Sequence, residues 1–276
     1  MGKIRAFLSF LNALRKASAK DDLTSLAAGI SFYFIFALVP LITVTITLLT
    51  FFRQTGLLEN LLHTFSDLIP QGTLSLLSLL LVNVNPGSLT IFSIIGLVIM
   101  LWSGSNAGEA IVSALDKIYE VRKTRGFVRR HTISLELAAS GVLVLIFLSF
   151  LLLVLSVALS TLSEFLPVSI GADFARFATY FLGLVFLTIL VAAIYRAVPN
   201  RKLSSRSSFP GALVFSFLWL MGSLLFNKVA VRFMFFDRAY GPLGVVFITL
   251  IWIHLSTIMF LVGAEINVIL RKKHSL

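Results

Sequence analysis

Two ionisable side chains, His254 and Glu265, lie inside the last apolar stretch of the sequence. In an α-helix their eleven-residue spacing places them about 20° apart around the axis and roughly 16 Å apart along it, so they share a face. A charged group at the centre of a membrane helix costs at least ~2.5 to 3.5 kcal/mol, so Glu265 should face protein, water or a headgroup. The pair predicts a polar track lining a cavity, in which His254 exchanges protons and Glu265 holds a cation or a partner.

Three further polar residues extend this candidate site. Asn267 follows Glu265 in the same segment, whereas Asn106 and Asp116 would reach it from an earlier helix. A structural role is the alternative for each of them. The histidine can be neutral and hydrogen-bonded to a neighbouring helix, and the glutamate can pair with Lys272 or a loop arginine. Polar groups near helix ends are often solvated or capped.

Other candidates concern lipid contact and helix packing. Three basic residues could grip a phosphate headgroup, with ordinary lipid contact or solvation as the alternative: Lys228, Arg232 and Arg238. A proline and several glycines mark positions where helices can bend or approach each other closely: Pro40, Gly104, Gly108, Gly241, Gly244 and Gly263.

A site of this kind needs apolar helices to hold it, and the composition predicts them. Of the 276 residues, 58% are hydrophobic and 13% are charged, against about 25% charged in soluble domains. The mean hydropathy is +0.99. We therefore expect a polytopic membrane protein with an all-α helical bundle. The net charge of +11 does not indicate nucleic-acid binding, because the basic residues stand in short loops between apolar runs.

The apolar pattern predicts six transmembrane helices in one domain over residues 21–276. An amphipathic helix over residues 1–20 is expected to lie in the interface, and short interfacial helices are expected in the first outer loop, over 57–82. Asp21 and Asp22 are interpreted as caps of the following helix. The six spans are placed at about 27–52, 89–110, 133–162, 174–198, 209–226 and 243–270.

The distribution of Lys and Arg predicts the orientation of these spans. Eighteen of the 23 basic residues fall in the N-terminal segment, the 117–130 connector, the 196–206 connector and the C-terminal tail. The positive-inside rule places these four segments in the cytoplasm, so both termini are expected there. Cysteine is absent, which excludes disulfides and thiol chemistry.

Several short motifs follow one another along the chain: Ala27-Ala28, Ser31-Phe32-Tyr33, Phe36-Ala37-Leu38, Pro40-Leu41, Ala114-Leu115, Ile118-Tyr119, Tyr195-Arg196, Pro199-Asn200-Arg201, Pro210-Gly211-Ala212, Tyr240-Gly241, Leu243-Gly244, Trp252, Gly263-Ala264-Glu265 and Asn267. In this order and spacing they resemble the YihY/virulence factor BrkB family of bacterial inner-membrane proteins, once labelled ribonuclease BN. The resemblance covers almost the whole chain and implies six helices in the inner membrane. Asp116 stands where the family usually has asparagine, and His254 where tyrosine or an apolar residue is typical.

Two classes of function fit these features. The first is movement or flipping of a lipid-like or amphipathic anionic solute, because proline and glycine interruptions beside a cavity are common in transport sites. The alternative is a non-transporting envelope scaffold that binds partner proteins or itself. We expect no enzyme, metal or cofactor and no nucleic-acid partner. Nuclease chemistry needs clustered metal ligands, whereas the four histidines are scattered: His63, His131, His254 and His274.

Overall fold

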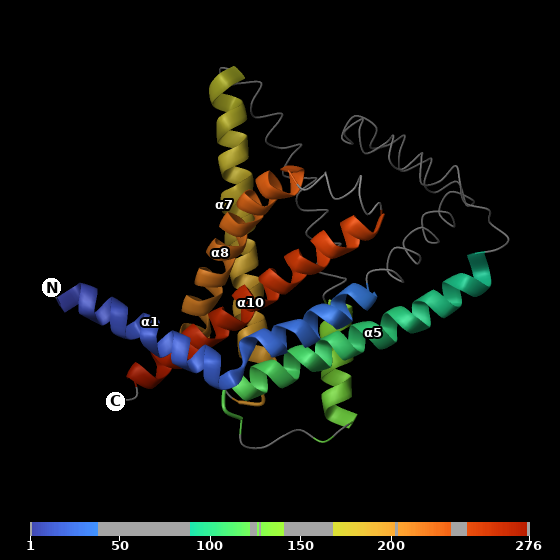
Figure 1. The fold of residues 1–276 in the computed structure, drawn as a ribbon, viewed down its shortest axis with the longest axis horizontal. Coiled ribbons are helices and arrows are strands. Elements are labelled where there is room, and N and C mark those ends of the chain that lie inside the picture. The colour runs from blue at the N-terminus through green and yellow to red at the C-terminus, as the bar shows by residue number, and fades with distance from the viewer. Residues whose placement is uncertain are drawn as a thin grey trace. The chain divides into compact units, whose positions relative to one another are not determined.

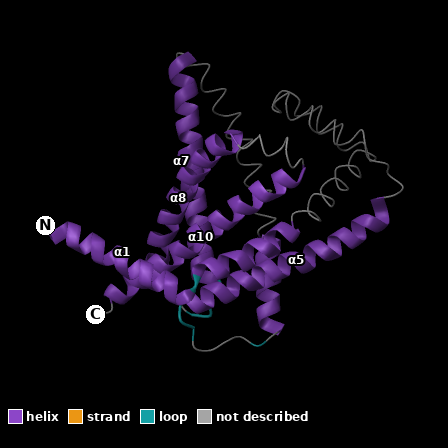
Figure 2. Cartoon of the chain, viewed as in Figure 1, coloured by secondary structure: helices purple, strands orange, loops and turns teal. Residues whose placement is uncertain are grey.

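The computed structural model describes residues 2–37, 89–121, 126, 128–140, 168–201, 204–232 and 242–274. Every regular element in these ranges is a helix, and they contain no strand (Figure 2). The prediction of an all-α protein is therefore confirmed for the described part of the chain. Pro40 and the predicted interfacial helices over 57–82 lie outside the described residues.

Seven helices make up the described structure (Figure 1). The first described residues form α1, and a second helix follows it directly at Leu23–Ala37. A further helix covers residues 128–140, after the end of α5. The labelled helices are α1 (Gly2–Asp21), α5 (Leu89–Ile118), α7 (Val168–Ala197), α8 (Ser205–Arg232) and α10 (Pro242–His274).

Three stretches in the described helices are long and apolar enough to cross a membrane: Tyr180–Ala197, Ser207–Phe226 and Phe247–Lys273. They coincide with the predicted spans at 174–198, 209–226 and 243–270. The predicted span at 89–110 falls within α5, which continues unbroken to Ile118. Spans 27–52 and 133–162 are described only as far as residues 37 and 140, so the count of six stays a prediction.

The outer faces of these helices carry large apolar side chains. On α7, Phe177 is 67% exposed and Ile189 is 60% exposed, and on α8 Leu225 is 64% exposed. Soluble proteins rarely expose such side chains over extended surfaces. A hydrocarbon solvent removes the cost of exposing them, which agrees with the assignment of a membrane protein.

The chain divides into two compact units: residues 1–34, 106–135 and 181–276 form one, and residues 35–105 and 136–180 form the other. In the first unit, Gly108 lies so close to the 128–140 helix that an added Cβ would be 2.5 Å from the carbonyl oxygen of Ser134. In the second unit, a Cβ on Gly104 would meet the Cβ of Ala138 at 3.4 Å. Both glycines thus allow close packing beside α5.

A sharp joint separates α1 from the helix at Leu23–Ala37. Asp22 occupies it with a φ of 53°, a left-handed conformation that aspartate tolerates better than most residues. Its carboxylate accepts a bond from the main-chain N–H of Ser25 at 3.5 Å, and its carbonyl oxygen accepts one from Leu26 at 3.1 Å. Asp22 therefore caps the second helix. Hydrogen bonding by the side chain of Ser25, and then by its main-chain N–H, lowers the pKa of the Asp22 carboxyl group.

The C-terminal end of α5 is closed by a Schellman motif. The N–H of Val121 donates to the carbonyl of Asp116 at 2.9 Å, and the N–H of Glu120 donates to that of Lys117 at 3.1 Å. Glu120 stands at the position that glycine usually occupies and has a φ of 52°. A glutamate there is strained, and residues held in such conformations often mark functional sites.

Helices α8 and α10 cross at two glycines within the first unit. A Cβ on Gly211 would lie 1.9 Å from the carbonyl oxygen of Gly263, and one on Gly263 would lie 2.7 Å from that of Gly211 and 2.5 Å from the hydroxyl of Tyr195. Only residues without a side chain permit this approach of two backbones. Farther along the same pair, Trp219 donates a hydrogen bond to Ser256 at 3.1 Å.

Candidate functional site

The last third of α10 carries two buried polar side chains, Glu265 and Asn267, which are each 1% exposed. The close crossing of α8 on α10 covers one side of this segment. Because polar groups without partners are costly to bury, the contacts of these two side chains decide what the segment does.

Asn267 uses both ends of its amide. Its oxygen accepts a bond from the main-chain N–H of Gly211 at 2.7 Å. Its nitrogen donates to the carbonyl of Ser208 at 3.1 Å and to the hydroxyl of Tyr119 at 3.2 Å. The side chain therefore joins α10 to the start of α8 and to the end of α5, next to Pro210, which stands inside α8.

Two tyrosines complete this junction. Tyr119 is 2% exposed, and burial raises the pKa of its phenol to about 12, so it stays neutral at physiological pH. Tyr195, on α7, is fully buried and donates to the carbonyl of Phe260 at 2.5 Å. Its ring also packs on the ring of Phe260, with the centroids 4.9 Å apart.

Glu265 differs from Asn267 because not all of its hydrogen-bonding atoms have a partner. Among the described residues, its Oε1 atom is buried and has no hydrogen-bond partner. Its neighbour is a second carboxyl group, that of Asp21 at the end of α1, which lies within hydrogen-bonding reach and is 8% exposed. Lys272, the predicted alternative partner, binds Glu120 and also acts electrostatically on Glu265, so a pair between Lys272 and Glu265 stays a prediction.

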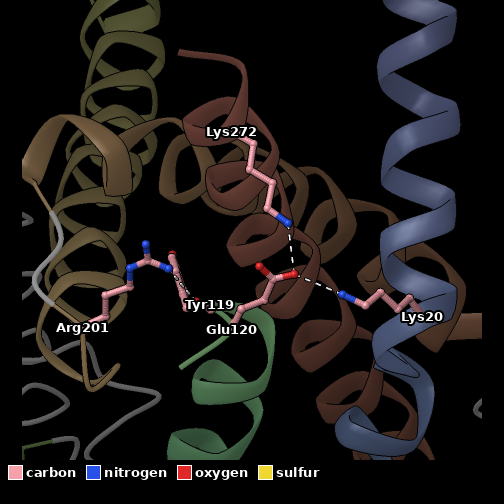
Figure 3. Close-up of polar contacts among 5 residues, drawn as sticks. All are labelled: Lys20, Tyr119, Glu120, Arg201 and Lys272. Atoms are coloured by element: carbon pink, nitrogen blue, oxygen red, sulfur yellow. Dashed lines mark hydrogen bonds and ion pairs between the residues drawn. The ribbon is translucent and has the colours of Figure 1, made fainter. Parts of the chain in front are cut away.

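Glu120 holds the ends of three helices together. Its Oε1 atom accepts bonds from Lys20 on α1 at 3.1 Å and from Lys272 on α10 at 3.0 Å (Figure 3). The bonds from Lys272 and then Lys20 lower the pKa of the Glu120 carboxyl group. The bond to Glu120 raises the pKa of Lys20. We call these three residues the Glu120 clasp.

More positive charge surrounds the clasp than Glu120 can neutralise. Lys117 donates to the carbonyl of Asp21 at 2.5 Å. Arg201 donates to the carbonyl of Tyr119 at 3.3 Å (Figure 3), and Arg271 is near enough to Arg201 for their charges to repel. These groups come from all four segments that the Lys and Arg distribution assigns to one side. We call the five cations the basic cluster: Lys20, Lys117, Arg201, Arg271 and Lys272.

The remaining predicted polar residues lie elsewhere. His254 is half-buried on α10, whereas Glu265 is fully buried, so the two ends of the predicted track have different surroundings. Asn106 is half-buried on α5, 13 residues or about 20 Å before Tyr119. Asp116 accepts a bond from the main-chain N–H of Asn200 at 2.8 Å and so fixes the turn after α7. That these three residues share a site with Glu265 stays a prediction.

The predicted lipid-contact and packing residues are only partly described. The backbone positions of Lys228 and Arg232 lie on α8, and that of Gly244 lies on α10. Arg238 and Gly241 fall outside the described residues. Gly263 lies at the α8–α10 crossing.

Three residues of this site are not among the predicted site residues. Asp21 was interpreted as a cap together with Asp22, but only Asp22 caps the next helix. Tyr119 was noted as part of a motif without a role. Glu120 was not singled out, although a carboxylate between Lys117 and the basic 122–130 connector could have suggested an ion pair. In the described part of the chain, no three His, Asp or Glu side chains are grouped to hold a metal ion.

Comparison with known proteins assigns the chain to a family. The family model described as Virulence factor BrkB matches residues 14–275. The chain belongs to the virulence factor BrkB family. The match includes α5, α7, α8 and all of α10, so the junction at Asn267 and the Glu120 clasp both lie inside the BrkB region.

Individual relatives of this BrkB-family chain carry general names. The ribonuclease-like protein YfkH of Bacillus subtilis (strain 168) is 28% identical over 98% of both chains. The UPF0761 membrane protein RSc1559 of Ralstonia nicotianae is 29% identical over 96% of this chain and 58% of its own length. A UPF0761 membrane protein of Xanthomonas oryzae is 27% identical over 94% of this chain and 60% of its own length. No solved structure matches.

Proposed function

We propose that this BrkB-family membrane protein moves or flips a lipid-like or amphipathic anionic solute across the bacterial inner membrane, with both termini in the cytoplasm. The observation that carries the proposal is the basic cluster. Its five cations stand at the ends of apolar helices, directly beside the buried polar segment of α10.

The charge of the cluster favours an anionic group. Glu120 binds two of the five cations through a single oxygen atom, and Arg201 and Arg271 repel each other. A phosphate or carboxylate between those two arginines would relieve the repulsion and accept charge-assisted hydrogen bonds. Clusters of basic residues at a membrane surface attract anionic headgroups by the same physics.

The helices beside the cluster favour an amphipathic solute. The three apolar stretches offer hydrocarbon contact for a tail, and Pro210 and Gly211, which stand inside α8, lie at the polar junction around Asn267. Proline and glycine near polar groups are a recurrent feature of helices in transport sites. The proposal includes membrane lipids as partners and assigns the protein no enzymatic step.

A leaflet-exchange assay tests this proposal. The full chain is reconstituted into vesicles containing phosphatidylcholine, phosphatidylglycerol and a trace of fluorescent phosphatidylglycerol, and an impermeant reductant quenches the accessible label. We expect quenching to extend beyond the outer leaflet only in vesicles that contain the protein. Fluorescent phosphatidylcholine should exchange more slowly than the anionic label.

The variant Arg201→Gln/Arg271→Gln should slow exchange of the anionic label and remove its advantage over phosphatidylcholine. A matched control is Arg5→Gln/Arg129→Gln, which removes two exposed arginines outside the cluster and should exchange both labels like the unchanged protein. Quenching confined to the outer leaflet with both labels would contradict transport of phospholipid-like solutes and would favour the scaffold function.

A further inference from the structure

Asp21 and Glu265 form a buried pair of carboxyl groups between α1 and α10. They are 8% and 1% exposed, and their side chains lie within hydrogen-bonding reach of each other. Two carboxylates at this separation repel strongly in a site that water hardly reaches, so both cannot be ionised without nearby positive charge.

The charged groups around the pair supply that charge only in part. Lys20 and Lys272 attract the carboxyl group of Glu265 through space, but both bind Glu120 and keep side-chain exposures of 66% and 56%. Lys117 binds the main-chain carbonyl of Asp21. From α5, the neutral hydroxyl of Tyr119 accepts the hydrogen bond of Asn267. Within the described residues, the Oε1 atom of Glu265 is left without a hydrogen bond.

A proton satisfies this geometry with the groups that are present. It removes one of the two negative charges and supplies the hydrogen bond that two carboxylates cannot make to each other. A metal ion would need further ligands, and no third His, Asp or Glu in the described structure joins the pair. We propose that Asp21 and Glu265 form a proton-binding site that holds one proton between their carboxyl oxygens at neutral pH.

Loss of the proton should weaken the contact between α1 and α10. The two carboxylates would then repel each other, while Asp22, in its left-handed conformation, provides a joint next to the pair. If the protein moves a solute, this proton is the coupling ion. That extension rests on the proposed function, whereas the binding site itself does not.

Infrared spectroscopy of the full chain in lipid nanodiscs tests the site without any transport measurement. A protonated carboxyl group has a C=O stretching band that an ionised carboxylate lacks. The unchanged protein should show this band at neutral pH and lose it during alkaline titration. Glu265→Gln should lack the band at neutral pH, and Glu136→Gln, which alters an exposed glutamate, should keep it.

Asp21→Asn should keep the band but lose it at a lower pH, because a negative neighbour no longer opposes ionisation. An unchanged titration in this variant would overturn the sharing of the proton. Absence of the band from the unchanged protein at neutral pH would overturn the proton site, as would a band that appears only when sodium is removed. The unchanged protein's titration decides this point even if a variant fails to fold.

Discussion

The side-chain oxygen of Asn267 accepts a hydrogen bond from the main-chain N–H of Gly211 at 2.7 Å, 56 residues earlier in the chain. The same amide donates to α8 and to Tyr119. One side chain thus fixes the relative positions of three elements in the first compact unit. The same junction borders both the basic cluster and the buried carboxyl pair.

Removal of this amide should destabilise the junction. Asn267→Ala leaves the carbonyl of Ser208 and the hydroxyl of Tyr119 without their donor, and each unpaired buried group costs about 1 to 3 kcal/mol. We expect a lower midpoint for thermal unfolding in detergent. Asn12→Ala, on the exposed surface of α1, serves as the control and should unfold like the unchanged protein. Equal midpoints for the two variants would show that the amide contributes little.

The close crossing of α8 and α10 at Gly211 and Gly263 leads to a second prediction. In Gly263→Ala the new methyl group would meet Tyr195 and the backbone of Gly211, and overpacking of this kind costs about 1 to 3 kcal/mol. Gly183→Ala is matched to it, because nothing lies within 4 Å of the added Cβ. Alanine is the better helix former by about 1 kcal/mol, so this control should be as stable as the unchanged protein or more so. Thermal unfolding of both variants measures the difference.

The Glu120 clasp should respond to pH at both ends of the range. Its lysine partners lower the pKa of Glu120 from 4.5, so the clasp contributes fully above that pH and is lost as the pH falls through the lowered value. At the alkaline end, the raised pKa of Lys20 keeps the contribution intact up to pH 10.5 and loses it at higher pH.

Thermal unfolding in detergent can follow this titration. Glu120→Gln should unfold at a lower midpoint than the unchanged protein at pH 7 to 8, and more so at low salt. The two midpoints should converge once the pH falls below the lowered pKa of Glu120. A difference that persists there would mean that Glu120 acts through something other than its charge.

The backbone of Glu120 allows a separate test. A glutamate with positive φ is strained relative to glycine, so Glu120→Gly should be more stable than Glu120→Gln by up to about 1 kcal/mol, although both remove the clasp. Unfolding of the two variants in the same detergent gives the comparison. If the glutamine variant is the more stable, the left-handed assignment of this residue is wrong.

The sequence predicted those features that depend on local pattern. Continuous apolar runs identified the helices that contain Tyr195, Phe215 and Leu261, and the position of Glu265 in such a run pointed to a buried ionisable group. The clasp could not be predicted in this way, because its contacts join residues 100 and 152 positions apart. Local pattern cannot tell which helix ends meet.

Asp21 shows a different limit. Two adjacent aspartates before an apolar run predict a helix cap, and Asp22 has that role. Whether Asp21 points to solvent or toward α10 depends on the left-handed turn at Asp22, which a sequence pattern does not specify. His254 shows the opposite case. It lies on the same helix as Glu265, as the spacing predicts, but His254 is half-buried and Glu265 is fully buried. A shared helix face therefore does not guarantee a shared environment.

The proposed function depends most directly on the basic cluster lying at the cytoplasmic face. Gly126, between α5 and the 128–140 helix, is exposed, and nothing lies within 4 Å of a Cβ added to it. Gly126→Cys would introduce the chain's only cysteine. An impermeant maleimide should leave it unlabelled in intact cells and label it once the membrane is permeabilised. Labelling from outside intact cells would contradict this placement and the function built on it.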